Sequence, residues 1–112
     1  MTKPLPASLR EATFEDDKTY GTDVLGGSED YVYEDGTIRG VCTIFQDILT
    51  IHIFGYHKEN SHRRTGAGRR ALSALAPHFK GIIANGVERN SDAERFWKEM
   101  RAEGLITEII HC

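Results

Sequence analysis

Residues 62–70 read HRRTGAGRR and bring four arginines, a histidine and two glycines together in nine positions. They follow the apolar run ILTIHIF and precede a segment in which apolar residues recur at helical spacing. The start of a helix has four backbone N–H groups without intrahelical partners and the positive end of the helix dipole, so it attracts phosphate or carboxylate. Gly66 and Gly68 leave those N–H groups uncovered by side chains. Position and composition together predict an anion-binding loop, although the fragment alone is more typical of a plain basic turn.

A strand and a helix must hold this loop in place. The segment DILTIHIFGYH, residues 47–57, is β-branched, aromatic and apolar on both faces as far as Tyr56, which is typical of a central strand. Pro77 and Gly81 end the segment that follows Gly66. Its apolar residues have the spacing of a helix: Leu72, Leu75, Ala76 and Phe79.

The other elements are predicted from similar local signals. The dipeptide Asp35-Gly36 predicts a tight hairpin between two β-rich runs within residues 31–45. Residues 8–12, 81–88 and 105–112 read as short strands, and residues 13–30 leave room for at most a short helix. A second helix, capped by Ser91 or Asn90 and ended by Gly104, has one apolar face: Ala93, Phe96, Trp97 and Met100.

This order of elements predicts the fold class. An antiparallel hairpin region feeds a strand, helix, strand unit, whose crossover makes its two strands parallel with a right-handed connection. We therefore expect an α/β fold, more narrowly an α+β mixed sheet, in a single domain over residues 1–112.

Composition narrows the class of protein. The chain has 112 residues, of which 39% are hydrophobic and 28% charged, as in a soluble globular domain. It has no apolar run near the roughly 20 residues that span a bilayer, and its first residues lack the apolar segment of a signal peptide, so we expect a cytoplasmic protein without a membrane segment.

The net charge of −3 argues against a nucleic-acid footprint over the whole protein, although residues 57–70 are basic. Cys42 and Cys112 are too few for a disulfide framework and have no metal-site spacing, so we expect free buried thiols and no metal.

Two motifs resemble the GNAT superfamily of N-acetyltransferases. The acetyl-CoA loop of that family reads Arg/Gln-x-x-Gly-x-Gly/Ala between its fourth strand and a helix, and is similar to Arg63 through Gly68. A second family motif, Asn-x-x-Ala-x-x-Phe-Tyr at the start of the next helix, is similar to NSDAERFW, residues 90–97. Weaker similarity covers residues 9–17 and 31–44, so that most of the chain is included. The resemblance implies a GNAT-like acyl-CoA N-acyltransferase fold with acetyl-CoA as co-substrate.

The chain also departs from the family. The family usually places two helices, which wall the acceptor site, where this chain has only residues 13–30, so we expect an open acceptor side. It usually has two strands after the last helix, where this chain has room for one, so a second copy of the chain is expected to complete the sheet as a homodimer. The family's tyrosine, often the acid that protonates the leaving thiolate, is Trp97 here, and an indole N–H cannot do this.

The resemblance also implies catalytic roles. His52 stands where lysine-acetylating members place a glutamate base, and imidazole titrates near neutrality, which suits deprotonation of an amine. A lone histidine in a strand is nevertheless more often structural. His57 and Glu59 are the alternative bases. The resemblance implies that a backbone N–H near Tyr56 polarises the thioester carbonyl.

Cofactor contacts follow from the same motifs. We expect Phe96 and Trp97 to belong first to the core, and only second to contact the cofactor. Asn90 is likewise expected to cap a helix first and to contact the cofactor second. Arg69 and Arg70 are more often solvated surface than phosphate ligands. The residues implied to contact the cofactor are His57, Lys58, Arg63, Arg64, Thr65, Gly66, Ala67, Gly68, Arg69, Asn90, Phe96 and Trp97.

These expectations lead to a small acetyl-CoA-dependent N-acetyltransferase acting on an amine, with a lysine or amino group of a protein or peptide as the expected acceptor. The alternative is a module of the same fold that binds CoA or a protein partner with little or no turnover, which Trp97 favours. A third interpretation, in which residues 62–70 contact nucleic acid, is less favoured and predicts binding that weakens steeply with salt.

Overall fold

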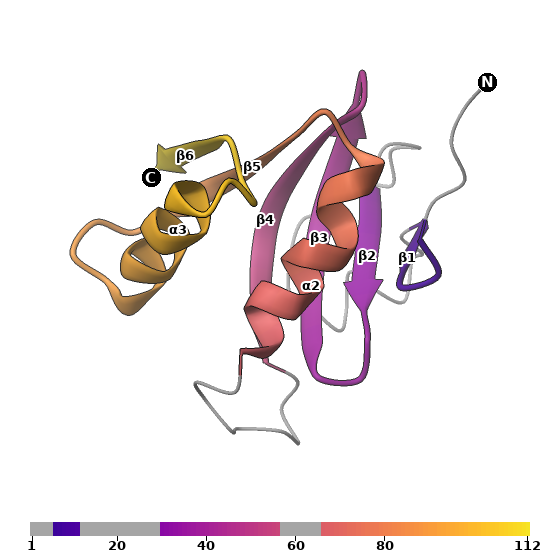
Figure 1. The fold of residues 1–112 in the computed structure, drawn as a ribbon, viewed down its shortest axis with the longest axis horizontal. Coiled ribbons are helices and arrows are strands. Elements are labelled where there is room, and N and C mark those ends of the chain that lie inside the picture. Colours follow the sequence, from indigo (N-terminus) through magenta and orange to yellow (C-terminus); the bar gives the residue numbers. More distant parts are fainter. Residues whose placement is uncertain (1–5, 12–29, 57–65) are drawn as a thin grey trace.

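The computed structural model describes residues 6–11, 30–56 and 66–112. Over these residues the chain forms one six-stranded sheet in the order β1-β2-β3-β4-β5-β6 (Figure 1). Neighbouring strands are antiparallel from β1 to β4, whereas β5 is parallel to both β4 and β6. The predicted mixed sheet is therefore confirmed, and the apolar run that predicted a central strand is β4. The strands are β1 (Leu9–Glu11), β2 (Asp30–Glu34), β3 (Ile38–Phe45), β4 (Ile48–Tyr56), β5 (Gly81–Val87) and β6 (Glu108–His111).

Two α-helices cover one face of this sheet. Helix α2 (Ala67–Leu75) continues into a short 3-10 helix, η1 (Ala76–His78), and α3 (Asp92–Ala102) connects β5 to β6. In Figure 1 both helices lie in front of the sheet, α2 over β3 and β4, and α3 over β5 and β6. This is the expected result of two right-handed crossovers that proceed in the same direction along the sheet.

The main core lies between the helices and the sheet. Alternate residues of β4 and β5 point toward the helices and are buried against the apolar faces that the sequence predicted. This core includes Leu49, Ile51, Ile82, Ala84, Leu72, Leu75, Trp97 and Met100. The other two apolar residues of the first helical pattern, Ala76 and Phe79, are only partly buried and pack against it.

Local interactions explain why the predicted hairpin and helix start occur where they do. The carboxylate of Asp35 accepts hydrogen bonds from the N–H groups of Thr37 and Ile38, and Gly36 has φ 91°, so the turn between β2 and β3 is stabilised by its own residues. Ser91 Oγ accepts from the N–H of Glu94 at 3.0 Å, which makes Ser91, and not Asn90, the cap of α3.

Two details differ from the sequence-based expectations. The last strand begins only at Glu108, because Gly104, with φ 80°, ends α3 and the buried Ile106 lies in the turn that follows. Both cysteines are free, and Cys42 is buried as expected, but Cys112 is exposed, so the expectation of two buried thiols was wrong. Residues 13–29, where a short helix was allowed, lie outside the described part of the chain. Neither α2 nor α3 combines the length and apolarity needed to cross a membrane.

Candidate functional site

A pocket opens where two parallel strands part. Strands β4 and β5 pair from Ile48 and Gly81 as far as Ile51 and Ala84, and their pairing stops there. A pocket of about 370 Å³ lies between the two separating strands. Its lining residues are Ile51, His52, Phe54, Asn85, Gly86, Val87, Glu88, Ser91, Ala93, Trp97 and Cys112. We call this the β4–β5 pocket.

Each of the two strands has an irregularity at this point. Between β3 and β4, Cys42 is opposite Ile51 and Val41 is opposite Ile53, so His52 is an extra residue in β4. Between β5 and β6 the register likewise skips Gly86, which has φ 74°. A β-bulge bends its strand and increases the local twist, which accounts for the separation of β4 from β5.

His52 is the bulged residue and lies on the sheet face opposite the helices. Its Nδ1 is 3.0 Å from Nδ2 of Asn85 on β5, and its Nε2 is 3.0 Å from Oγ1 of Thr43 on β3. Three neighbouring strands thus contribute one polar side chain each, and the His52–Asn85 contact bridges β4 and β5 just beyond the last paired residues. The structure therefore places the predicted His52 in the pocket, with both ring nitrogens engaged.

The sequence analysis missed both partners of His52. Asn85 is a polar residue inside the otherwise apolar strand GIIANGV, and this was a usable signal, because an amide in a strand interior needs a hydrogen-bond partner. Thr43 gave no comparable signal, since threonine is common in strands.

The opposite wall of the pocket is aromatic. The ring centroid of Phe54 lies 5.4 Å from that of Trp97 and 6.4 Å from that of Phe96. Trp97 is buried in the core and also lines the pocket, whereas Phe96 packs beside Trp97 without lining the pocket. The expected core role is therefore confirmed for Trp97, and Phe96 lies behind the wall rather than in it.

The first turn of α2 is adjacent to this wall. A Cβ added to Gly68 would lie 3.5 Å from the Phe54 ring and 2.8 Å from Cζ of Phe96. Gly68 is therefore needed for close packing of α2 against the aromatic residues, and not only to uncover backbone N–H groups. Gly66 has a different role: it precedes α2 with φ 78°, a left-handed conformation that glycine adopts without strain.

The two helices begin differently. Helix α3 has the Ser91 cap and two acidic residues, Asp92 and Glu94, in its first turn. Helix α2 has no side-chain hydrogen bond at its cap and no acidic residue in its first turn. The positive end of the α2 dipole is therefore not neutralised by its own first turn, as an anion site requires.

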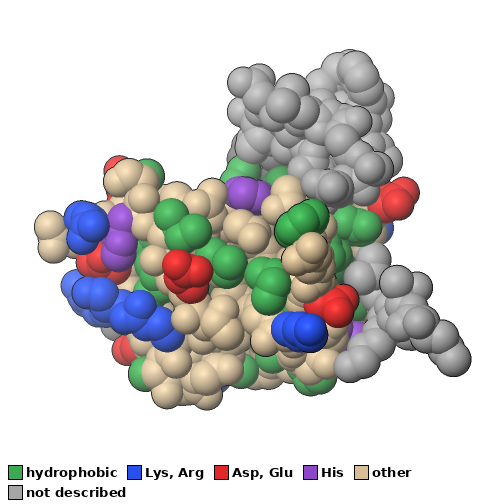
Figure 2. All heavy atoms as spheres, turned by 90° about the horizontal axis from the view of Figure 1, so that it is seen from above, with side chains coloured by type: hydrophobic (Ala, Val, Ile, Leu, Met, Phe, Trp, Pro, Cys, Tyr) green, Lys and Arg blue, Asp and Glu red, His purple; other side chains and the backbone are tan. Residues whose placement is uncertain are grey.

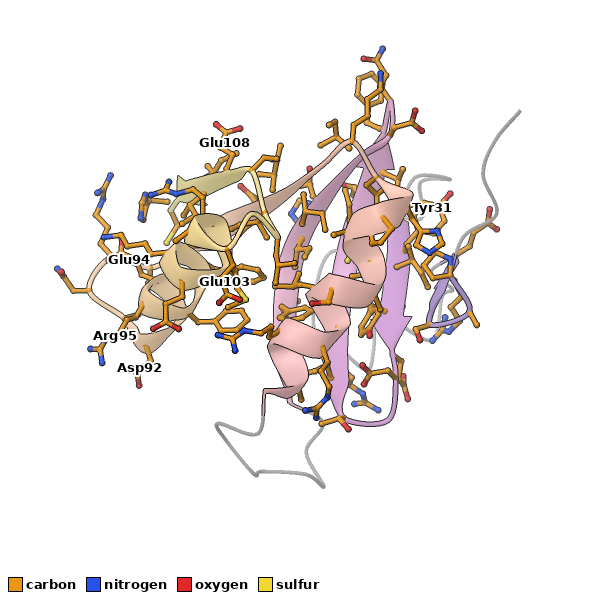
Figure 3. The ribbon with its side chains drawn as sticks, viewed as in Figure 1. Tyr31, Asp92, Glu94, Arg95, Glu103 and Glu108 are labelled. Atoms are coloured by element: carbon orange, nitrogen blue, oxygen red, sulfur yellow. The ribbon has the colours of Figure 1, made fainter. Side chains whose placement is uncertain are left out.

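The arginines of α2 point to different places. Nη2 of Arg69 lies 2.7 Å from Oε2 of Glu103, so this predicted cofactor contact instead joins α2 to the end of α3, where Figure 3 labels Glu103. Arg70 folds back toward the helix start, with Nη1 3.5 Å from where a Cβ on Gly66 would be. Burial acts to raise the pKa of Asp35, but the hydrogen bonds that it accepts, together with the charge of Arg70, lower it overall.

The remaining predicted residues are placed as follows. Tyr56 ends β4 opposite Ile38 of β3, and Ala67 is buried in the first turn of α2. Asn90 is exposed, has φ 61°, and its N–H donates to Oε1 of Glu94. Five predicted cofactor contacts and both alternative bases, of which His57 belongs to both groups, lie outside the described residues: His57, Lys58, Arg63, Arg64, Thr65 and Glu59.

Within the described ranges, no group of three or more His, Cys, Asp or Glu side chains is arranged to hold a metal ion. Comparison of the chain with models of protein families, with curated proteins and with solved structures found no match.

Proposed function

We propose that this protein is a small acetyl-CoA-dependent N-acetyltransferase of GNAT type. The observation that carries the proposal is the parting of the parallel strands β4 and β5 at His52, directly before the loop and helix start that resemble the acetyl-CoA motif. The pocket formed there is adjacent to the first turn of α2, because Phe54 contributes to both. In the proposal, a single elongated ligand extends from the helix start into the pocket.

The chemistry of the pocket suits the arm of coenzyme A. Beyond Ile51 and Ala84 the facing edges of β4 and β5 no longer pair with each other, so their backbone groups on these edges can bond to the two amides of a pantetheine chain. Phe54, Trp97 and Val87 supply an apolar wall for its methylene groups. In the proposal the diphosphate binds the N–H groups that open α2, assisted by Arg63 and Arg64.

In the proposed reaction His52 removes a proton from the acceptor ammonium, whose free pKa is about 10.4 for a lysine. The neutral amine then attacks the thioester carbonyl, which a β4 backbone N–H near Tyr56 polarises. The C–S bond breaks, the thiolate of coenzyme A departs, and the second proton of the attacking nitrogen is lost to water, which leaves the neutral amide. A thiol with a pKa of about 8.5 leaves without much acid assistance, so the tryptophan at position 97 does not prevent turnover.

The proposal further includes a lysine or amino group of a protein or peptide as acceptor, a cytoplasmic location and a homodimer. His52 is exposed, which is compatible with an acceptor larger than a free small molecule. Among the described strands β6 lies at an edge of the sheet, and in the proposal a second copy adds along this edge.

Calorimetry and a thiol-release assay test the proposal. We expect the protein to bind coenzyme A and acetyl-CoA, and to release free thiol when amine acceptors are added. Replacing His52 by Gln should lower kcat by about 10²- to 10⁴-fold with the same affinity for coenzyme A, because it removes only the base. His78→Gln, at the end of η1, is the matched control and should behave like the unmodified protein.

Absence of binding heat with both coenzyme A and acetyl-CoA on folded protein would overturn the proposal. Binding without thiol release over a broad amine panel would instead favour the second candidate, a module that binds coenzyme A without turnover. Two observations favour this candidate: Trp97 belongs to the core, and both ring nitrogens of His52 already have partners.

A further inference from the structure

The hydrogen bonds of His52 restrict where its ring proton can be. A neutral imidazole has one N–H and one lone pair, and the partners of the two nitrogens select between the two tautomers. Here the partners come from strands on either side, Asn85 from β5 at Nδ1 and Thr43 from β3 at Nε2, each at 3.0 Å.

The partner atoms select one tautomer. Nδ2 of an amide can only donate, so Nδ1 of His52 must accept from Asn85. The ring proton is then on Nε2, and the hydroxyl oxygen of Thr43 accepts from it. The lone pair on Nδ1 lies toward Asn85, which lines the β4–β5 pocket together with His52.

We propose that Asn85 and Thr43 together position His52 as the Nε2–H tautomer: Asn85 donates to Nδ1 and so selects the tautomer, and Thr43 accepts from Nε2–H, so that the basic lone pair is presented on the side of the pocket. The position of Thr43 is well defined, because it lies within the paired region of β3, opposite Thr50 of β4. A hydroxyl fixed by two flanking strands can hold the imidazole plane as well as its proton.

The inference rests on the proposed function for its catalytic meaning. With no substrate bound, the amide N–H of Asn85 occupies the Nδ1 lone pair as the N–H of an acceptor would. An incoming ammonium group displaces that amide and transfers its proton to Nδ1, which leaves a neutral amine and an imidazolium. Nε2–H stays bonded to Thr43 throughout, and the imidazolium later releases the Nδ1 proton to water.

The tautomer can be measured directly. The test uses long-range ¹H–¹⁵N correlation spectra of protein labelled with ¹⁵N-histidine, recorded at a pH at which the rings are neutral. The signals of His52 are assigned by their loss in His52→Gln. We expect a protonated Nε2 and an unprotonated Nδ1 in the unmodified protein. Protonation at Nδ1 overturns the proposal.

Three variants separate positioning from general structure. Asn85→Asp keeps the shape but replaces the donor at Nδ1 by an acceptor, so we expect the ring proton to move to Nδ1. Thr43→Ser keeps the hydroxyl and should keep the Nε2–H tautomer. Thr50→Val changes the cross-strand neighbour of Thr43 and should leave His52 unchanged. An unaltered tautomer in Asn85→Asp contradicts the inference.

Kinetics provide the second readout. We expect Thr43→Val to lower kcat/KM for the amine by about 10- to 100-fold, the usual effect of losing an orienting partner, with unchanged affinity for acetyl-CoA and substantial recovery in Thr43→Ser. If the unmodified protein turns over and Thr43→Val is equally active, the positioning role is wrong. If the unmodified protein neither binds coenzyme A nor turns over, the proposed function fails, while the spectra still decide the tautomer.

Discussion

At the scale of single residues, the two glycines at the start of α2 are required for different structural reasons. Gly68 has no room for a side chain, since an added Cβ would lie 2.8 Å from Phe96. Gly66 has room for a Cβ, but its φ of 78° is a left-handed backbone conformation that strains any residue other than glycine. The same sequence fragment that predicts an anion site therefore also meets a packing requirement and a backbone requirement.

We expect Gly68→Ala to destabilise the fold by about 1–3 kcal/mol through overpacking against Phe96. Gly66→Ala should cost about 1–2 kcal/mol through left-handed backbone strain. Urea unfolding measures both. The distinguishing experiment repeats each change in a Phe96→Leu background, where the penalty of Gly68→Ala should shrink and that of Gly66→Ala should persist. Equal penalties for Gly68→Ala in both backgrounds would contradict the packing explanation.

The two cysteines also differ at this scale. Burial raises the pKa of the Cys42 thiol to about 12, whereas Cys112 is exposed beside the pocket. Because the thiolate is the reactive form, we expect a thiol reagent at pH 8 to modify Cys112 quickly and Cys42 only after unfolding. Mass spectrometry of the labelled native protein checks this, with Cys112→Ser as control. Rapid modification of native Cys112→Ser would show that Cys42 is accessible.

At the scale of elements, the start of α3 is held by reciprocal hydrogen bonds. Ser91 accepts from the Glu94 N–H, and Glu94 in turn accepts from the Asn90 N–H and contacts His111 of β6. Figure 3 labels Glu94 on α3 beside β6. One carboxylate thus both caps the helix and joins it to the edge strand.

We expect Ser91→Ala to lower the free energy of unfolding by about 0.5–2 kcal/mol, the usual cost of losing a cap. Ser73→Ala changes an exposed serine inside α2, where alanine is the better helix former, and should be neutral or slightly stabilising. Chemical denaturation of the two variants compares the positions. A neutral Ser91→Ala would show that the cap hydrogen bond contributes little.

Glu94 at the start of α3 also predicts that the stability of the fold depends on pH. The hydrogen bond from Asn90, with His111 and Lys98 nearby, holds the pKa of Glu94 below its usual range against the opposing effect of burial. A carboxylate with a lowered folded-state pKa stabilises the fold above its unfolded pKa, and this stabilisation is lost as the pH falls through the folded value. The stability difference between the unmodified protein and Glu94→Gln should therefore shrink below about pH 4.3. Unfolding curves between neutral and acidic pH test this, with Glu99→Gln on the same helix correcting for the lost charge.

At the scale of the whole molecule, the charge distribution bears on the choice of ligand. Lys and Arg side chains gather at the left in Figure 2, at the end of the molecule formed by α3. Two of the α3 cations have acidic neighbours on the same helix, Arg95 with Asp92 and Lys98 with Glu94. Within the described part of the chain, such interspersed charge differs from the basic stripe expected of a nucleic-acid surface.

A ligand that bridges α2 and the β4–β5 pocket should stabilise the whole fold. With coenzyme A at 100 times its Kd, we expect the free energy of unfolding to rise by about 2.7 kcal/mol. Thermal unfolding at increasing coenzyme A concentration measures this. Arg63→Ala with Arg64→Ala should weaken the effect, because both guanidinium groups are proposed to hold the diphosphate. An equal shift with total RNA that disappears at high salt would instead indicate a general anion effect.

The types and the order of the described elements were predictable from the sequence. The Asp35-Gly36 turn, the apolar period of α2 and the capping serine of α3 depend on residues within a few positions of one another, so their signals are readable along the chain. The mixed sheet followed from this order, since a helix between two strands makes them parallel. His52 was likewise a candidate catalytic base from the sequence, through the family resemblance.

The assembly of the site, by contrast, depends on contacts between elements that are distant in sequence. The partners of His52 come from strands that are distant in sequence, and the bulge at His52 is defined by its register against β3. Arg69 pairs with Glu103, 34 residues away, and the need for Gly68 comes from Phe96 on another helix. The periodicity of apolar residues along the chain indicates which face of its own strand or helix a residue occupies. It does not indicate the register between strands, or which residue lies across a packed interface, because these depend on how distant elements pack together.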